Sequence, residues 1–147
     1  MRTGFYAVML AGLLLLTGCG QEQWLDHQGH PVSRAAMGGQ WVVVNYWAEW
    51  CAPCRAELPE FNRLERDHAD VTVLGINYDG VSGEQLLELI SKMDIQFPVM
   101  GQDFADSLGL KRPEVLPTTY IINPEGKLVH SLPGPQTEQT LLGLLNR

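Results

Sequence analysis

Two cysteines separated by two residues form the strongest chemical signal in the sequence. Cys51 and Cys54, with Ala52 and Pro53 between them, follow an apolar, β-branched run at 41–47. That run predicts a strand buried on both faces. Pro53 predicts the start of an amphipathic helix, since proline is favoured in a first helical turn. A Cys-x-x-Cys pair between a buried strand and a helix is typical of a redox-active dithiol that cycles through a Cys51–Cys54 disulfide.

The expected helix N-terminus gives the two cysteines different roles. Its unpaired amides and dipole favour an anion, so Cys51 is the predicted nucleophilic thiolate. It would attack a client disulfide, and Cys54 would resolve the mixed disulfide. Glu57 lies three residues after Cys54, so one helical turn points its side chain toward the side of the dithiol. An inert, stabilising disulfide stays open as the alternative.

The remaining residues do not favour a metal or haem site. A structural zinc ion normally needs four ligands, and the sequence has no second Cys-x-x-Cys and no histidines with ligand spacing. Covalent haem attachment would need a histidine where Arg55 stands. We therefore expect no metal and no other cofactor.

Residues 1–18 have the layout of an export signal. A positive start at Arg2 precedes 12 apolar residues at 5–16, fewer than the roughly 20 that a membrane-spanning helix needs. The run 16–19, Leu-Thr-Gly-Cys, resembles the lipobox of bacterial lipoproteins, which implies that Cys19 is lipidated and becomes the mature N-terminus. Lipidation would also explain the odd count of three cysteines. The alternative is an ordinary cleaved signal beside an unrelated cysteine.

Length and patterning predict one α/β domain at 23–147, joined to Cys19 by a short tether at 19–22. A chain of 147 residues, 45% of them hydrophobic, has room for one ordinary core. The net charge of −7 argues against a nucleic-acid partner. The expected elements are a hairpin from 23–26 and 30–32, strands at 41–47, 71–77, 97–100, 118–123 and 127–132, and helices from 53 with a kink at Pro59, at 83–93, at 104–108 and at 137–145.

Two separated segments carry a family resemblance. Residues 42–54, VVVNYWAEWCAPC, look like the active-site strand and loop of thioredoxins. Residues 116–127, LPTTYIINPEGK, are similar to the cis-proline segment of exported TlpA/ResA-like proteins. The resemblance implies a thioredoxin fold, a central mixed β-sheet flanked by helices, with an N-terminal β-hairpin and a βα insertion. It also implies a thiol–disulfide oxidoreductase.

The resemblance further assigns roles around the substrate. It implies that Pro117 forms a cis peptide bond, faces the cysteine pair and offers the adjacent backbone of Leu116 and Thr118 to an extended client. From the sequence alone, a trans proline at the start of a strand would be expected. Trp47 and Trp50 both resemble active-site aromatic residues of the family, which shape a flat apolar surface beside the cysteines. For Trp47, core packing is the simpler interpretation.

Asn45 departs from cytoplasmic thioredoxins, which place a buried carboxylate at this point of the strand. An asparagine cannot titrate, so the proton of Cys54 needs another acceptor. TlpA/ResA-like proteins carry a glutamate where Glu57 stands, which implies a proton-handling role for it. Without the resemblance, a solvated helix glutamate would be the default. Glu49 is expected to be a solvated loop carboxylate with no role.

The expected function is reduction of disulfides in exported proteins, as in relatives that keep apocytochrome c or other cysteine-bearing clients reduced. The implied partners are such clients, a membrane thiol–disulfide electron donor, and the membrane itself through Cys19, on the periplasmic side of the cell envelope. Inner or outer membrane, and the direction of electron flow, stay open. The alternatives are a peroxiredoxin-like antioxidant peroxidase, for which no Thr-x-x-Cys pattern is present, and a copper chaperone or binding module, for which no Cys-x-x-x-Cys is present.

Overall fold

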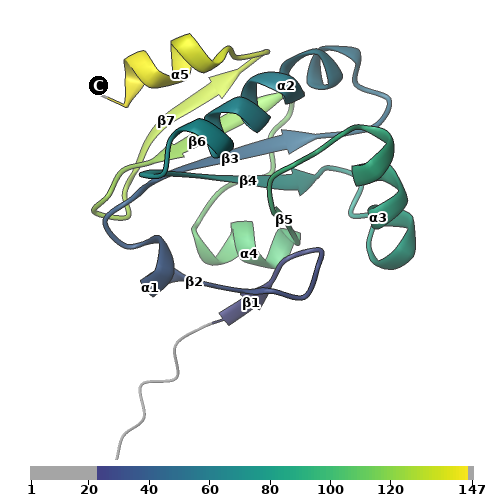
Figure 1. Ribbon diagram of the computed structural model, residues 1–147, viewed down its shortest axis with the longest axis horizontal. Helices are drawn as coiled ribbons and strands as arrows, with labels where there is room; N and C mark the ends of the chain where they lie inside the picture. The colour runs from purple at the N-terminus through teal and green to yellow at the C-terminus, as the bar shows by residue number, and fades with distance from the viewer. Residues whose placement is uncertain (1–22, 146–147) are drawn as a thin grey trace, which may run out of the picture.

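The computed structural model describes residues 23–145, and a five-stranded sheet forms its centre (Figure 1). The strand order is β5-β4-β3-β6-β7. β3 pairs in parallel with β4 and antiparallel with β6, so the sheet is mixed as predicted. The strands are β3 Trp41–Trp47, β4 Val71–Asn77, β5 Val99–Met100, β6 Thr118–Ile122 and β7 Leu128–Pro133.

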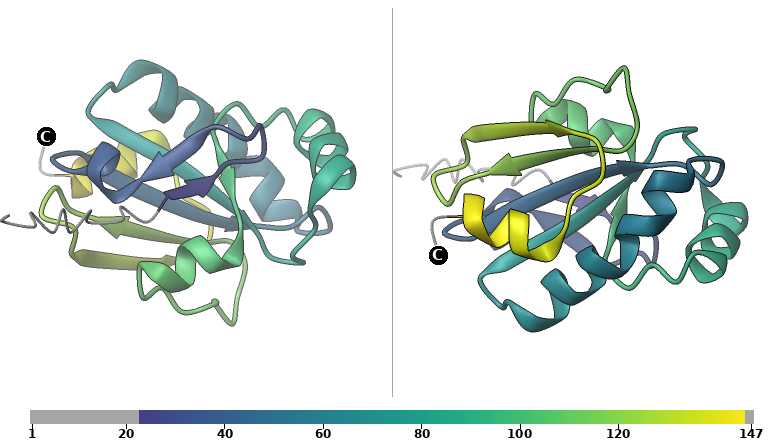
Figure 2. Two further views of the ribbon diagram at one scale, coloured as in Figure 1. Left: turned by 90° about the horizontal axis from the view of Figure 1, so that it is seen from below. Right: turned by 90° about the horizontal axis from the view of Figure 1, so that it is seen from above.

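Helices and a hairpin cover the two faces of this sheet (Figure 2). One face carries α2 Ala52–Asp67, α3 Gly83–Lys92 and α5 Glu138–Leu144. The other face carries α4 Gln102–Ser107, a short α1 Arg34–Met37, and the antiparallel hairpin of β1 Gln23–Leu25 and β2 Pro31–Ser33. The segment between β4 and β6 holds α3, β5 and α4, and which part of it is the predicted βα insertion stays a prediction. Of these elements, only α1 has no counterpart in the sequence-based prediction.

The central strand β3 divides its side chains between two apolar clusters. Val43 and Trp47 join the cluster beneath α2, whereas Val44 and Tyr46 join the cluster on the opposite face. Since side chains alternate along a strand, Asn45 points to the same side as Val43 and Trp47. Asn45 is therefore a buried polar group beneath α2.

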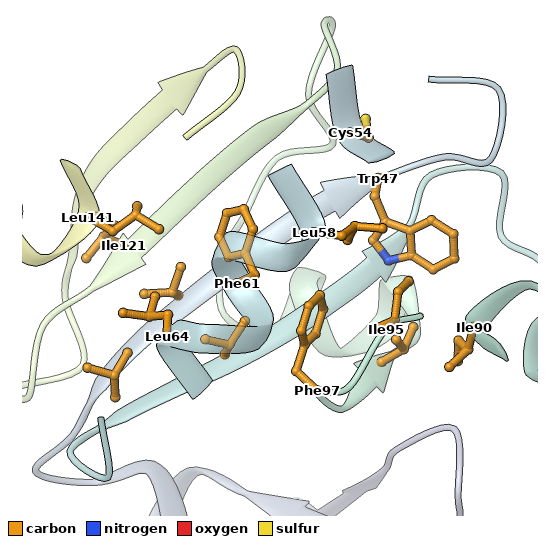
Figure 3. Close-up of a cluster of buried hydrophobic side chains, with 14 of the residues drawn as sticks. Trp47, Cys54, Leu58, Phe61, Leu64, Ile90, Ile95, Phe97, Ile121 and Leu141 are labelled. Carbon is orange, nitrogen blue, oxygen red and sulfur yellow. The ribbon is translucent and has the colours of Figure 1, made fainter. Parts of the chain in front are cut away.

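The cluster beneath α2 holds the inner cysteine (Figure 3). Leu58, Phe61 and Leu64 line the buried side of α2, and Trp47 of β3 lies next to Leu58 and close to Cys54. Gly75 of β4 permits this packing, because a Cβ there would meet the Phe97 ring at 2.9 Å and Trp47 Nε1 at 3.0 Å. The apolar packing thus seats the start of α2 directly on the sheet.

The helix α2 runs through Pro59 without interruption, and the predicted kink there stays a prediction. No helix among residues 23–145 is long and apolar enough to cross a membrane. The predicted signal at 1–18, the lipidation site Cys19 and the tether at 19–22 lie outside the described residues and stay predictions.

Candidate active site

Cys51 and Cys54 occupy the first turn of α2, at the carboxyl end of β3. Cys51 is the N-cap residue, and its Sγ accepts a hydrogen bond from the Cys54 backbone N–H at 3.2 Å. A disulfide joins the two residues, with their Cα atoms 5.3 Å apart. Cys51 retains 4% of its surface and Cys54 retains none. An incoming thiol or disulfide would therefore reach Cys51 first, and amides of the helix N-terminus would stabilise its thiolate.

Glu57 is a buried carboxyl group one helical turn after Cys54. Only 2% of its surface is exposed. The Gln136 backbone N–H donates to Glu57 Oε2 at 2.8 Å, and Asn45 Nδ2 donates to Glu57 Oε1 at 2.7 Å. Burial raises the pKa of Glu57 to about 7, and the two hydrogen bonds only partly oppose this rise. The default of a solvated glutamate is wrong for this position.

Asn45 is the residue whose contribution the sequence analysis missed. It cannot titrate, but its Nδ2 binds Glu57 and lies 3.3 Å from Thr119 Oγ1 of the neighbouring strand β6. Its Oδ1 has no hydrogen-bond partner among residues 23–145. A lone amide within an apolar strand was the available signal, because buried polar groups require partners. The contact with Gln136 comes from a loop 79 residues away and left no signal in the sequence.

The peptide bond between Leu116 and Pro117 is cis, as the resemblance implied. Thr118 pairs with Tyr46 near the end of β3, so Pro117 lies at the same sheet edge as the loop that leads to Cys51. Leu116 is partly buried and packs against the cluster that contains both cysteines. The site residues predicted from distant segments are thus brought to one end of the sheet.

Thr118 itself contributes no exposed side chain to this end of the sheet. It is 3% exposed, and its Oγ1 donates to the Val115 carbonyl at 2.9 Å. The Pro117 carbonyl accepts the Gly134 N–H at 2.9 Å. A role for Thr118 in substrate binding therefore stays a prediction that concerns its backbone, and Leu116 offers the more accessible surface.

The two tryptophans near the dithiol have opposite environments. Trp47 is fully buried in the core, whereas Trp50 is 63% exposed beside Cys51. Glu49, expected to be a solvated loop carboxylate with no role, forms an ion pair with Lys92 Nζ at 2.6 Å. The Arg55 guanidinium donates to the Glu49 carbonyl. The loop before Cys51 is therefore held from the side of α2 and α3, which the sequence did not indicate.

Within residues 23–145, no three His, Cys, Asp or Glu side chains gather closely enough to hold a metal ion. The histidines make separate contacts instead. His27 Nδ1 accepts the Val99 N–H at 3.0 Å, and His68 Nε2 lies 3.0 Å from Glu138 Oε1. The candidate site of the described chain thus consists of the dithiol and the groups around it.

These features define a class of protein. A dithiol at the start of a helix, a cis proline at the same sheet edge, and a mixed sheet covered by helices on both faces are the parts of a thioredoxin-fold thiol–disulfide oxidoreductase. Exchange through a mixed disulfide is the chemistry that such a site supports.

Comparison with known proteins identifies the family. The model of the AhpC/TSA family matches residues 19–131. Thiol-disulfide oxidoreductase ResA of Bacillus cereus is 29% identical over 123 residues, which span 83% of this chain and 71% of that protein. Thiol:disulfide interchange protein HelX of Rhodobacter capsulatus is 29% identical over 104 residues, 70% of this chain and 57% of that protein. The crystal structure of a DsbF homologue from Corynebacterium diphtheriae covers 86% of this chain and 83% of its own, with 25% identity and a TM-score of 0.71.

The chain belongs to the AhpC/TSA family and is a TlpA/ResA-like thiol–disulfide oxidoreductase. The predicted family, fold and type of enzyme are confirmed.

Proposed function

We propose that this protein reduces disulfides of exported clients, for example in cytochrome c maturation, on the periplasmic side of the cell envelope. The relatives named ResA and HelX support an extracytoplasmic, membrane-associated oxidoreductase. The observation that carries the mechanism is the buried, hydrogen-bonded Glu57 one turn from Cys54. Glu57 can accept the proton of the resolving cysteine, Cys54, whereas Asn45 cannot.

The first half of the cycle takes place at Cys51. Its thiolate attacks one sulfur of the client disulfide, and the other client sulfur leaves as a thiolate that takes a proton from water. Cys51 is then joined to the client as a mixed disulfide. Trp50 and Leu116 line the approach and contact the client chain, whose backbone lies along the segment at Pro117 and Thr118.

The second half of the cycle releases the client. The Cys54 thiol transfers its proton to Glu57, and the resulting thiolate attacks the Cys51 sulfur. The second client sulfur leaves as a thiolate and is protonated, so the client has gained two electrons and two protons. The Cys51–Cys54 disulfide that remains is reduced by a membrane dithiol donor. A lipidated Cys19 would hold the domain close to this donor, since several acyl chains together bind a membrane durably.

The role of Glu57 predicts a specific pH dependence. A general base must be ionised, and the pKa of Glu57 is about 7, so insulin reduction should slow as the pH falls below that value. Glu57→Gln should lower kcat at pH 8 by about 100-fold, in the range of general-base effects, and should flatten the profile. Turnover measured from pH 5.5 to 8.5 tests this. Glu84→Gln, which changes an exposed carboxylate on α3, is the matched control. Equal profiles for wild type and Glu57→Gln would remove Glu57 from the mechanism.

The client and the role of each cysteine are tested by trapping. Cys54→Ser should accumulate mixed disulfides through Cys51 in intact cells, and adding Cys51→Ala should abolish them. The trapped partners identify the clients. If no client is recovered and both cysteines of the wild type stay oxidised in cells, the disulfide is inert. Rapid peroxide turnover without disulfide reduction would favour the peroxidase, and tight copper binding without reduction would favour the copper module.

The anchor is tested separately from the chemistry. Cells fed labelled palmitate should incorporate it into the wild-type chain and not into Cys19→Ala. The Cys19→Ala chain should be recovered in the soluble extracytoplasmic fraction. A wild-type chain without label would contradict lipidation and leave the dithiol chemistry untouched.

A further inference from the structure

The exposed side chain of Trp50 is fixed by a residue from another loop. Its indole Nε1–H points at the Asp79 carboxylate, 3.0 Å from Oδ2 and 3.3 Å from Oδ1. Asp79 follows the carboxyl end of β4, which pairs with the end of β3. An exposed tryptophan side chain can adopt several rotamers unless contacts such as these hold it in one of them. The indole beside Cys51 is therefore restrained although it is exposed.

Tyr78 packs against the same indole, and Arg112 packs against Tyr78. The rings of Trp50 and Tyr78 meet edge to face, with centroids 6.4 Å apart and an interplanar angle of 87°. The Arg112 guanidinium carbon lies 4.1 Å from the centroid of the Tyr78 ring. The same guanidinium donates to the Tyr78 carbonyl at 2.7 Å.

These contacts join three segments around the dithiol. Trp50 belongs to the loop that ends at Cys51, Tyr78 and Asp79 to the loop after β4, and Arg112 to the segment that leads to the cis Pro117. The Tyr78 backbone N–H also donates to the Trp47 carbonyl at 2.8 Å, which ties the middle loop to the end of β3. The Trp50 ring is thus held by the Asp79 carboxylate and the Tyr78 ring, and Tyr78 is held in turn by Arg112 and the Trp47 carbonyl.

We propose that Tyr78, Asp79 and Arg112 are positioning residues that hold the Trp50 indole as a preformed apolar platform for protein clients. This inference rests on the proposed function, since it assigns the platform to the client-binding step. A preformed contact surface binds more tightly, because less freedom is lost on association, and tryptophan is favoured at the centre of interfaces. The platform acts on client binding and leaves the exchange chemistry of Cys51 and Cys54 unchanged.

The test compares a protein substrate with a small one. Tyr78→Leu removes the ring between Trp50 and Arg112, whereas Tyr78→Phe keeps it and serves as the matched control. Asp79→Ala removes the acceptor of the indole N–H. We expect Tyr78→Leu and Asp79→Ala to raise KM for insulin by about three- to tenfold, the range expected for freeing one large side chain. Their kcat and their rates with 2-hydroxyethyl disulfide should match those of wild type, and Tyr78→Phe should match wild type in every assay.

Fluorine NMR of protein labelled with 5-fluorotryptophan observes the ring directly. Trp50→Phe assigns the Trp50 signal among the four tryptophans. That signal should narrow and shift in Tyr78→Leu and Asp79→Ala, and it should stay at the wild-type position in Tyr78→Phe.

The outcomes separate this inference from the proposed function. An unchanged KM for insulin in Tyr78→Leu and Asp79→Ala overturns the platform. Equal losses with insulin and 2-hydroxyethyl disulfide overturn it as well, because the residues would then act on the dithiol or the fold. A wild-type protein that reduces neither substrate overturns the proposed reductase. In that case, an unchanged Trp50 fluorine signal in the two variants would overturn the positioning role itself.

Discussion

At the residue scale, Glu57 brings an ionisable group into the interior, and no cationic side chain of residues 23–145 pairs with it. Its two hydrogen-bond partners, the Asn45 side-chain amide and the Gln136 backbone N–H, stabilise the carboxylate less than water does. The pKa of Glu57 is therefore raised from 4.5 to about 7. The unfolded chain ionises Glu57 at a lower pH than the folded chain, so the folded state binds more protons between these two values.

This difference predicts how stability changes with pH. The contribution of Glu57 should become unfavourable as the pH rises from about 4.5 to 7, and the full penalty, on the order of 3 kcal/mol, should apply above pH 7. Glu57→Gln loses one hydrogen bond at every pH, since its amide accepts at one atom only, but it cannot ionise. Its stability relative to wild type should therefore improve from pH 5 to pH 8. Urea unfolding of the oxidised proteins measures this, and a constant difference would contradict the raised pKa.

From the sequence, site residues could be related to one another only where they lie close together in one segment of the chain. Helical spacing put Glu57 on the same side of the helix as the dithiol, but its role was implied only by the family resemblance and stays a prediction. Gln136 and Tyr78 could not be given their roles, since each acts through a partner that is distant in sequence, whereas Asn45 left one signal, a lone amide within an apolar strand. The role of Arg112 could not be predicted either, because no sequence pattern indicates that a charged loop residue packs on a tyrosine ring.

At the scale of elements, the turn of the β1–β2 hairpin binds β5 through two hydrogen bonds of one residue, His27. The His27 backbone N–H donates to the Val99 carbonyl at 2.9 Å, and the imidazole Nδ1 of His27 accepts the Val99 N–H at 3.0 Å. Trp24 of β1 also meets Phe104 of α4 edge to face, with ring centroids 5.3 Å apart. The turn of the hairpin thus binds β5 as a further strand would, but with a titratable acceptor.

Because His27 Nδ1 can be protonated, we expect the contact between the hairpin and β5 to loosen at acid pH. Burial lowers the pKa of His27 from its ordinary value; nearby Asp26 opposes this shift and His30 adds to it. Since the unfolded chain takes up the proton first, stability is lost as the pH falls below 6.5, the ordinary pKa. The protonated ring can no longer accept from Val99. We expect the protection factor of the Val99 amide in hydrogen exchange to fall between pH 7.5 and 5.5.

The matched variants for this prediction are His27→Asn and His30→Asn. The asparagine at 27 can place an oxygen where Nδ1 lies and does not titrate, so its Val99 protection should stay constant with pH. His30 is in the same turn, with a side chain that is 69% exposed, and its replacement should leave the loss seen in wild type. A fall of equal size in His27→Asn would show that another group loosens the hairpin.

The elements themselves were largely predictable. The bounds of β3 and β4 match the predicted runs, because apolar runs of β-branched residues form buried strands. Thr137 caps α5 as expected, accepting from the Thr140 N–H. The four-residue α1 was missed, since a helix of one turn is too short for a periodic pattern, and its cap Ser33 lies at the end of a strand.

At the scale of the whole molecule, the two faces of the sheet carry separate apolar clusters with different roles. The face under α2 supports the dithiol, Trp47 and Glu57, whereas the other face binds the hairpin and α4. Sequence patterning indicated both faces, because β3 is apolar on each side. It did not indicate which loops meet at the active end, and the cis proline was placed there only by family resemblance.

The direction of electron flow is a property of the whole fold and predicts a difference in stability. Folding and oxidation are linked by a thermodynamic cycle, so a fold that makes its dithiol a reductant must stabilise the disulfide relative to the unfolded chain. About 30 mV corresponds to 1.4 kcal/mol in this cycle, and a strong oxidant shows the opposite, a stabilised reduced form. We therefore expect the oxidised protein to unfold at a higher urea concentration than the reduced protein at pH 7. The double variant Cys51→Ala, Cys54→Ala, measured with and without reductant, reports any effect of the reductant itself. A reduced form more stable than the oxidised form would assign the protein to disulfide formation in its clients, with the same two cysteines working in reverse.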